Sequence, residues 1–189
     1  MAEAIGFHFV DREIVQEAAL HLGLDPEVAS SRDERVPDIV EEVGLALAAS
    51  TPGFGPEFGM PPVAEVDGRA LAEATSRVIH ALADAGGYVI LGRGAQCILA
   101  GRADVLHASL VGTPDDRARR ISEWQHIDEH TARHRCRDLD GERAAYVKRY
   151  YGRDIRDPLL YDLVLNTSLL SLTDATDLIV AAARRKLAA

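Results

Sequence analysis

The chain alternates short apolar runs with longer stretches of helical character, and this alternation restricts its fold more than any other feature. Each apolar run leads into a segment whose apolar residues recur at three- and four-residue intervals. The four runs are GFHFV at 6–10, YVILG at 88–92, VLHASLVG at 105–112 and DLVLNTS at 162–168. This pattern predicts an α/β fold, in which a parallel sheet has helices on both faces. Burial on both faces would explain why YVIL and LVL are continuous apolar runs.

Local signals mark the boundaries of several expected elements. Thr113 can cap a helix N-terminus, with Pro114 at the first helical position and acidic residues in the first turn. Ser171 and Asp174 have the spacing of a capping box at the start of the last helix. The segment TPGFGPEFGMPP at 51–62 is rich in glycine and proline, so we expect a loop there that bounds a small helical insert.

The composition restricts the classes of function. With 189 residues and 47% hydrophobic content, the chain can form one compact domain with a real core. A net charge of −9 argues against a nucleic-acid-binding surface spread over the molecule. The first residues lack the pattern of a signal peptide, no apolar run reaches about 18 residues, and the two cysteines have no paired spacing. We therefore expect a cytoplasmic protein that binds neither nucleic acid nor membranes.

Positive charge gathers in one stretch of the chain. Residues 117–157 contain eleven Lys and Arg against eight Asp and Glu, a net of +3, so the remainder carries −12. A basic segment in an acidic protein favours a small anionic ligand, although a solvated helix face of mixed charge would have the same composition. Only Lys148 and Lys186 are lysines, and arginine is the better bidentate ligand for phosphate.

Five arginines are candidates for contacting this anion. Arg93 lies between Gly92 and Gly94 at the expected carboxyl end of a strand, where parallel sheets bind their ligands. The two glycines do not complete a dinucleotide-binding motif, because Cys97 stands in the third glycine position. The other four form two pairs with a spacing of three, Arg117 with Arg120 and Arg153 with Arg156. We expect these pairs to stabilise a transferring phosphoryl group by their charge.

The segment HIDEH at 126–130 suggests a different chemistry. It matches the H-x-x-E-H pattern of inverted zinc peptidases, with His126 and His130 expected one helical turn apart and Glu129 as the base. Only one glutamate, Glu142, follows His130 as a possible acidic third ligand. We favour a plain polar helix face as the explanation of the pattern, so we assign no metal ligand and keep a zinc protein only as a remote alternative.

Several segments together resemble the cytidylate kinase-like family of the P-loop nucleoside monophosphate kinases. They are VIHALADAGGYVILGRGAQCIL, VLHASLVGTPDDRARRI and YYGRDIRDPLLYDLVLNTSLLSLTDATDLIVAA, and the similarity extends back to FHFVDREIVQEAA. The resemblance implies a three-layer, P-loop kinase-like α/β fold in a single domain over 1–189. It also implies a helical acceptor-binding insert at about 25–65 and a lid at about 117–155. The implied reaction is phosphoryl transfer from ATP, with Mg²⁺, to a nucleoside monophosphate such as CMP.

The resemblance also implies roles for individual residues. Arg93 corresponds to the arginine of the family's GR motif on the acceptor side, and Asp162 matches an aspartate that helps to recognise cytosine. Asp11 and Arg12 lie where the family approaches the acceptor nucleotide. The expected catalytic residues are the arginines at the lid entry, Arg117 and Arg120, and those after the lid, Arg153 and Arg156.

The chain departs from the family pattern at its start. In these kinases a central strand precedes a glycine-rich turn whose backbone N–H groups hold the donor's phosphates. Here the first residues resemble the end of the helix that follows this turn, and no glycine-rich turn occurs before Gly23. Without the first central strand, two neighbouring strands would have unpaired backbone groups. We expect impaired phosphoryl transfer and interpret the chain as truncated or mis-started; filling of the gap by another chain or a swapped segment, and a natural non-catalytic relative, are the alternatives.

A second class of function is therefore a non-catalytic nucleotide-binding or assembly module. It would keep the acceptor site and lose donor binding, so CMP would raise its melting temperature and ATP would not. An incomplete sheet also favours a homodimer.

Overall fold

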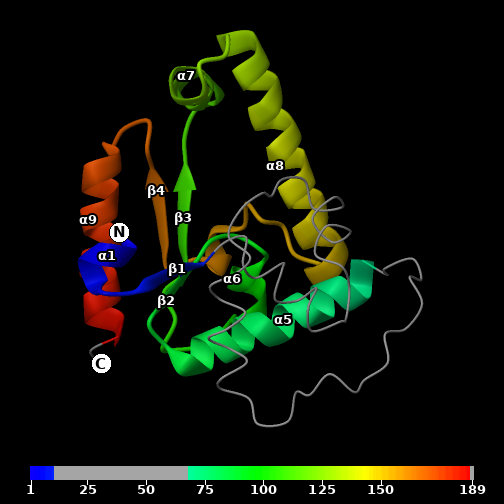
Figure 1. The fold of residues 1–189 in the computed structure, drawn as a ribbon, viewed down its shortest axis with the longest axis vertical. Helices are drawn as coiled ribbons and strands as arrows, with labels where there is room; N and C mark the ends of the chain where they lie inside the picture. Colours follow the sequence, from blue (N-terminus) through cyan, green and yellow to red (C-terminus); the bar gives the residue numbers. More distant parts are fainter. Residues whose placement is uncertain (11–67, 188–189) are drawn as a thin grey trace, which may run out of the picture. The chain divides into compact units, whose positions relative to one another are not determined.

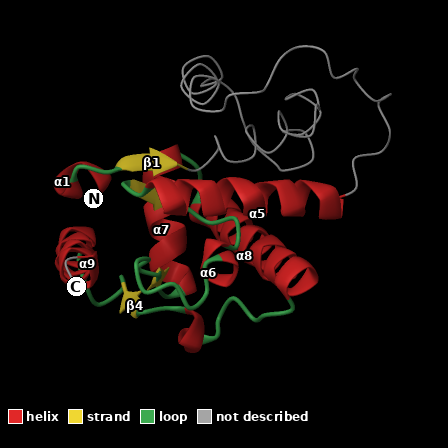
Figure 2. Ribbon diagram, turned by 90° about the horizontal axis from the view of Figure 1, so that it is seen from below, coloured by secondary structure: helices red, strands yellow, loops and turns green. Residues whose placement is uncertain are grey.

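The computed structural model describes residues 1–10 and 68–187, which divide into two compact units. One unit is Phe7–Ala95 and the other is Met1–Gly6 with Gln96–Ala189; we call them the β1–β2 unit and the β3–β4 unit after their strands. Helices make up most of the described secondary structure, and the strands are short (Figures 1 and 2). The predicted insert at 25–65, the segment 51–62 and the candidates Asp11 and Arg12 lie outside the described residues.

The β1–β2 unit contains one parallel strand pair and one long helix. Its elements are β1 (His8–Val10), α5 (Gly68–Ala85) and β2 (Tyr88–Ile90). The pairing places Phe9 opposite Val89, and the N–H of Leu91 extends the ladder by donating to Val10 O at 2.9 Å. The helix α5 buries Ala72, Ala74, Thr75 and Ile79, spaced as one helical face.

The β3–β4 unit has a second parallel strand pair with helices around it (Figure 1). Its strands are β3 (Ala108–Val111) and β4 (Leu163–Asn166), paired with Ser109 opposite Val164. The other elements are α1 (Ala2–Ile5), α6 (Ala95–Ile98), α7 (Pro114–Gln125), α8 (Glu129–Tyr151), the 3₁₀ turn η1 (Pro158–Leu160) and α9 (Leu172–Leu187). Arg184 of α9 donates to Ala4 O at 2.9 Å and joins α1 to α9.

The predicted helix caps are confirmed. Thr113 Oγ1 accepts the backbone N–H of Asp116 at 3.2 Å, and Pro114 stands at the first position of α7. Ser171 Oγ accepts the N–H of Asp174 at 3.0 Å at the start of α9. These bonds satisfy backbone donors that a helix N-terminus otherwise leaves without a partner.

The α/β class predicted from the sequence is confirmed, since each of the four apolar runs contains a strand and both strand pairs are parallel. The apolar strand residues are less buried than predicted, however. Leu110 of β3 is 55% exposed, and Phe9 of β1 is exposed to the same extent. Within the described residues each sheet has two strands. A two-stranded parallel sheet has too few neighbours to bury both faces of its strands.

Candidate functional site

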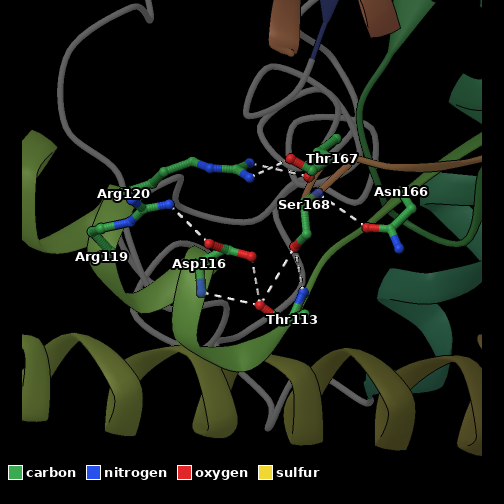
Figure 3. A network of polar contacts seen from close by, with 7 residues as sticks. All are labelled: Thr113, Asp116, Arg119, Arg120, Asn166, Thr167 and Ser168. Carbon is green, nitrogen blue, oxygen red and sulfur yellow. Dashed lines mark hydrogen bonds and ion pairs between the residues drawn. The ribbon is translucent and has the colours of Figure 1, made fainter. Parts of the chain in front are cut away.

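The carboxyl ends of β3 and β4 form a polar edge at which α7 begins (Figure 3). The backbone N–H of Thr113, just after β3, donates to Ser168 Oγ at 2.8 Å, and Ser168 follows β4. The N–H of Thr167 donates to Val111 O at 2.8 Å and extends the strand pairing by one more bond. This edge is where parallel α/β sheets usually bind ligands.

Gly112 permits the close approach of the two chain segments at this edge. A Cβ atom at this position would lie 3.2 Å from both Ser168 Oγ and Thr167 Oγ1, and 3.4 Å from Cγ of Arg117. The two 3.2 Å distances are tighter than nine in ten contacts that real Cβ atoms make. A side chain at position 112 would therefore require Thr167 or Ser168 to shift by a few tenths of an ångström.

Arg120, in the second turn of α7, is attached to the end of β4. Its Nη1 donates to Thr167 Oγ1 at 3.0 Å, and its Nη2 donates to the carbonyl oxygen of Thr167. Thr167 is only 8% exposed, and its own hydroxyl donates to Val111 O at 2.9 Å. Both acceptors of Arg120 are neutral, so these bonds fix its guanidinium without neutralising its charge.

Arg117 lies three residues earlier on α7 and has a different partner. Its two terminal nitrogens donate to the two carboxylate oxygens of Asp140 on α8, at 2.5 and 2.8 Å. This bidentate pair holds the pKa of Asp140 below its ordinary value, because the hydrogen bonds and the charge of Arg117 favour the ionised carboxylate. The pair joins the two long helices of the predicted lid.

The N-terminus of α7 carries its own carboxylates. The hydroxyl of Thr113 lowers the pKa of Asp116, and Ser168 and the nearby arginines act in the same direction. Asp116 also accepts a hydrogen bond from Arg119 at 2.8 Å, and Asp115 forms an ion pair with Arg133 of α8. These negative charges already interact with the positive end of the helix dipole, so this helix end is poorly suited to bind an anion.

The second arginine pair follows α8. The helix ends at Gly152, which has a left-handed φ of 69°, and Arg153 is exposed beside α6, where its charge opposes the burial that raises the pKa of Cys97. Arg156 donates to Asp154 at 3.3 Å. Arg117 meets α8 at Asp140, about 16 Å of helix before Tyr151. Among the described residues, no hydrogen bond or ion pair joins the two arginine pairs.

Arg93 lies three residues after the last residue of β2, at the carboxyl end of that strand as predicted. It has a left-handed φ of 57°, and its neighbours Gly92 and Gly94 have φ values of 79° and 71°. Residues other than glycine rarely adopt this backbone conformation, because it raises their conformational energy by about 1–2 kcal/mol. The loop after β2 therefore holds the half-buried Arg93 in a strained conformation.

The prediction that His126 and His130 lie one turn apart on one helix is wrong. His126 ends α7 with a left-handed φ of 53°, and α8 starts at Glu129 after Asp128, whose side chain caps it by accepting the N–H of Thr131. The segment is thus a corner between two helices. In the part of the chain that the structure describes, no group of three or more His, Cys, Asp and Glu side chains could hold a metal ion.

Comparison with known proteins identifies the family. A family model described as the cytidylate kinase-like family matches residues 1–169 of this chain. The chain belongs to the cytidylate kinase-like family. A cytidylate kinase from Sulfolobus acidocaldarius is 39% identical over 72 residues, a match that covers 38% of this chain and only 40% of that relative. The chain is therefore aligned with less than half of the curated relative.

A solved structure shares the fold of this cytidylate kinase-like chain. The crystal structure of an uncharacterized protein from Eubacterium ventriosum superposes with a TM-score of 0.65, over 97% of this chain and 87% of that chain. The sequence identity is 22%, so the similarity supports the α/β fold and nothing finer.

In this family member, Asp162 lies at the amino end of β4, away from the polar edge. Its two oxygens accept hydrogen bonds from Lys186 Nζ at 2.6 Å and from the backbone N–H of His107 at 2.7 Å. Burial alone would raise the pKa of Asp162, but these two donors outweigh it and lower the pKa. Asp162 thus joins β3, β4 and α9, and its contact with a base stays a prediction.

Sequence reasoning missed the partners of the arginines in this kinase-like site. Asp140 and Thr167 lie 23 and 47 residues from the arginines that they hold, so no local spacing indicated them. One signal for Thr167 is present in the sequence, because Asn166–Ser168 ends one expected strand run and Gly112 ends another. Carboxyl ends of neighbouring parallel strands meet at one edge.

Proposed function

We propose that this chain is a nucleoside monophosphate kinase domain that transfers a phosphoryl group from ATP to CMP or a closely related acceptor. Membership of the cytidylate kinase-like family supports the reaction class. The observation that carries the proposal within the structure is Arg120, whose charge is fixed at the carboxyl edge of a parallel strand pair without a carboxylate partner. Phosphoryl transfer needs such positioned cations more than it needs a covalent catalyst.

The four paired arginines would share the negative charge of the reacting phosphates. In the reaction, an oxygen of the acceptor's phosphate attacks the terminal phosphorus of ATP and ADP leaves, while charge spreads over the equatorial oxygens. Arg120 and the exposed Arg153 can contact such oxygens directly. Arg117 and Arg156 would first exchange Asp140 and Asp154 for phosphate. We assign Arg93 to the acceptor side as an anion ligand, and Asp11, Arg12 and Asp162 stay predicted substrate ligands.

ATP and Mg²⁺ fit the residue types present in different ways. Arginine forks suit the phosphates of ATP, whereas the described residues include no cluster of three or more potential metal ligands. Mg²⁺ keeps several waters and binds largely through phosphates, so it would enter with the nucleotide and neutralise phosphate charge there.

Ligand-dependent thermal stability tests this proposal. We expect CMP to raise the melting temperature of the 189-residue chain, since a ligand at 100 times its Kd adds about 2.7 kcal/mol to the stability. Arg153→Ala should reduce this shift. Arg137→Ala is the matched control, because Arg137 is also exposed and forms no ion pair with a described residue. Absence of a shift at millimolar CMP would contradict the proposal.

The same experiment separates the second candidate function, a nucleotide-binding module without transfer. Engagement of Arg117 by Asp140 favours this candidate, because a carboxylate occupies both terminal nitrogens of one expected catalytic arginine. A CMP shift without any formation of ADP in a coupled assay would support the module. A CMP shift together with ADP formation that depends on CMP would support the kinase.

None of the described helices is long and apolar enough to cross a membrane.

A further inference from the structure

We propose that Thr167 is a positioning residue that holds the guanidinium of Arg120 for contact with an oxyanion of the phosphate type. This inference rests on the proposed function for the nature of the ligand. Its structural basis is that Arg120 donates two hydrogen bonds to one residue, to the hydroxyl oxygen and the carbonyl oxygen of Thr167 (Figure 3).

The three arginines of α7 differ in how their charge is compensated. Arg117 donates to the carboxylate of Asp140, and Arg119 donates to the carboxylate of Asp116. Arg120 is the one arginine of this helix that donates to neutral acceptors among the described residues. Asp116 is near enough for the charge of Arg120 to lower its pKa, but the oxygens of Asp116 bind Thr113 and Arg119. The positive charge of Arg120 therefore remains available to a ligand.

Thr167 is itself fixed in position. Its backbone N–H and its hydroxyl both donate to Val111 O, at 2.8 and 2.9 Å, so the hydroxyl proton points to β3 and a lone pair is left for Arg120. The residue is almost fully buried, and Gly112 leaves the space that its hydroxyl occupies. A rigid acceptor in the strand ladder thus sets the position of the arginine.

The bonds to Thr167 leave Arg120 with unused donors. A guanidinium has five N–H groups, and the two bonds to Thr167 engage two of them. Three N–H groups remain among the described contacts, enough for a bidentate bond to an oxyanion. A neutral, buried anchor combines a fixed geometry with an unneutralised charge, which is what stabilisation of a phosphoryl group requires.

The test compares Thr167→Val, Thr167→Ser and Arg120→Ala in the 189-residue chain, with inorganic tripolyphosphate as the probe in calorimetric titrations. Thr167→Val keeps the shape and removes the hydroxyl, and Val111 O still accepts the backbone N–H of residue 167. We expect the Kd to rise 3- to 10-fold in Thr167→Val, to rise further in Arg120→Ala, and to stay within twofold of the parent in Thr167→Ser. Rescue by serine is the result that a loss of buried packing alone would not give, because serine lacks the methyl group that valine retains.

The outcomes separate this inference from the proposed function. A parent chain that binds CMP and tripolyphosphate, with an unchanged Kd in Thr167→Val or in Arg120→Ala, would overturn the positioning role and leave the kinase proposal standing. A parent chain that binds CMP but not tripolyphosphate would also overturn it. A parent chain that binds neither compound would contradict both proposals.

Discussion

Replacement of Asp140 by asparagine removes the charge that joins α7 to α8 while keeping the size of the side chain. Arg117 contacts both oxygens of Asp140, and the two side chains are 30% and 46% exposed. Fully exposed ion pairs contribute about 0.2–1 kcal/mol, whereas breaking a fully buried pair is unfavourable by about 3–5 kcal/mol. For this partly exposed bidentate pair we expect a loss of about 1 kcal/mol, which lowers the melting temperature by about 3 °C in a chain of this size.

The pH dependence gives this prediction a second readout. Arg117 depresses the pKa of Asp140 in the folded protein, so the pair stabilises the fold above the unfolded-state pKa of about 4. That contribution is lost as the pH falls through the lower, folded-state pKa. The difference in melting temperature between the parent chain and Asp140→Asn should therefore be constant from pH 8 to pH 5 and should shrink below about pH 4.

Asp138→Asn provides the matched control on the same helix. Asp138 is exposed and forms no ion pair with a described residue, yet its replacement changes the net charge by the same amount. We expect its effect on the unfolding free energy to stay within about 0.5 kcal/mol. Two results would refute the assignment of the stabilisation to the pair with Arg117. One is an equal loss of unfolding free energy in Asp138→Asn and Asp140→Asn, and the other is a melting-temperature difference between Asp140→Asn and the parent chain that does not vary with pH.

Substitutions at four further positions test other parts of the structure. Gly112→Ala should destabilise the chain by about 1–3 kcal/mol in chemical denaturation, because the new methyl group would press on Ser168 and Thr167; a neutral result would mean that this edge can widen freely. Arg93→Gly should be more stable than Arg93→Ala by about 1 kcal/mol, since both remove the side chain and only alanine is strained at a φ of 57°; equal stabilities would argue against the left-handed loop. Asp162→Asn and Lys186→Met should lower the melting temperature by similar amounts, since each breaks the same 2.6 Å pair, and a CMP-induced shift reduced only in Asp162→Asn would support the predicted base contact.

The elements of this fold could be predicted where local chemistry determines them. The caps at Thr113 and Ser171 depend on residues three positions apart, and the apolar runs identify the strands directly. The prediction for the histidine segment at 126–130 is wrong because the spacing of four between His126 and His130 does not lie within one helix. Asp128, a good N-cap residue, starts a new helix there and leaves His126 in the left-handed conformation.

The candidate site was predictable only in its residue types. The spacing of Arg117 and Arg120 indicated a shared helix face, but their partners come from α8 and from the end of β4. Such contacts depend on how distant segments meet, and periodicity carries no information about that. Asp140 compensates the positive charge of Arg117, whereas Thr167 holds Arg120 through neutral oxygens. Neither residue belongs to a motif that the sequence alone would single out.

Substitution of Asp140, the partner of Arg117, and of Thr167, the partner of Arg120, should change anion binding in opposite directions. If Arg117 binds phosphate during the reaction, it must first leave Asp140, and the free energy of that pair opposes anion binding. Asp140→Asn should then lower the stability of the chain and tighten the binding of tripolyphosphate by up to about 5-fold, the factor that corresponds to about 1 kcal/mol. Thr167→Val should lower stability and weaken the same binding, because it loosens an arginine that is already available. Weaker binding in both variants would mean that Asp140 positions Arg117 for the anion in the way that Thr167 positions Arg120.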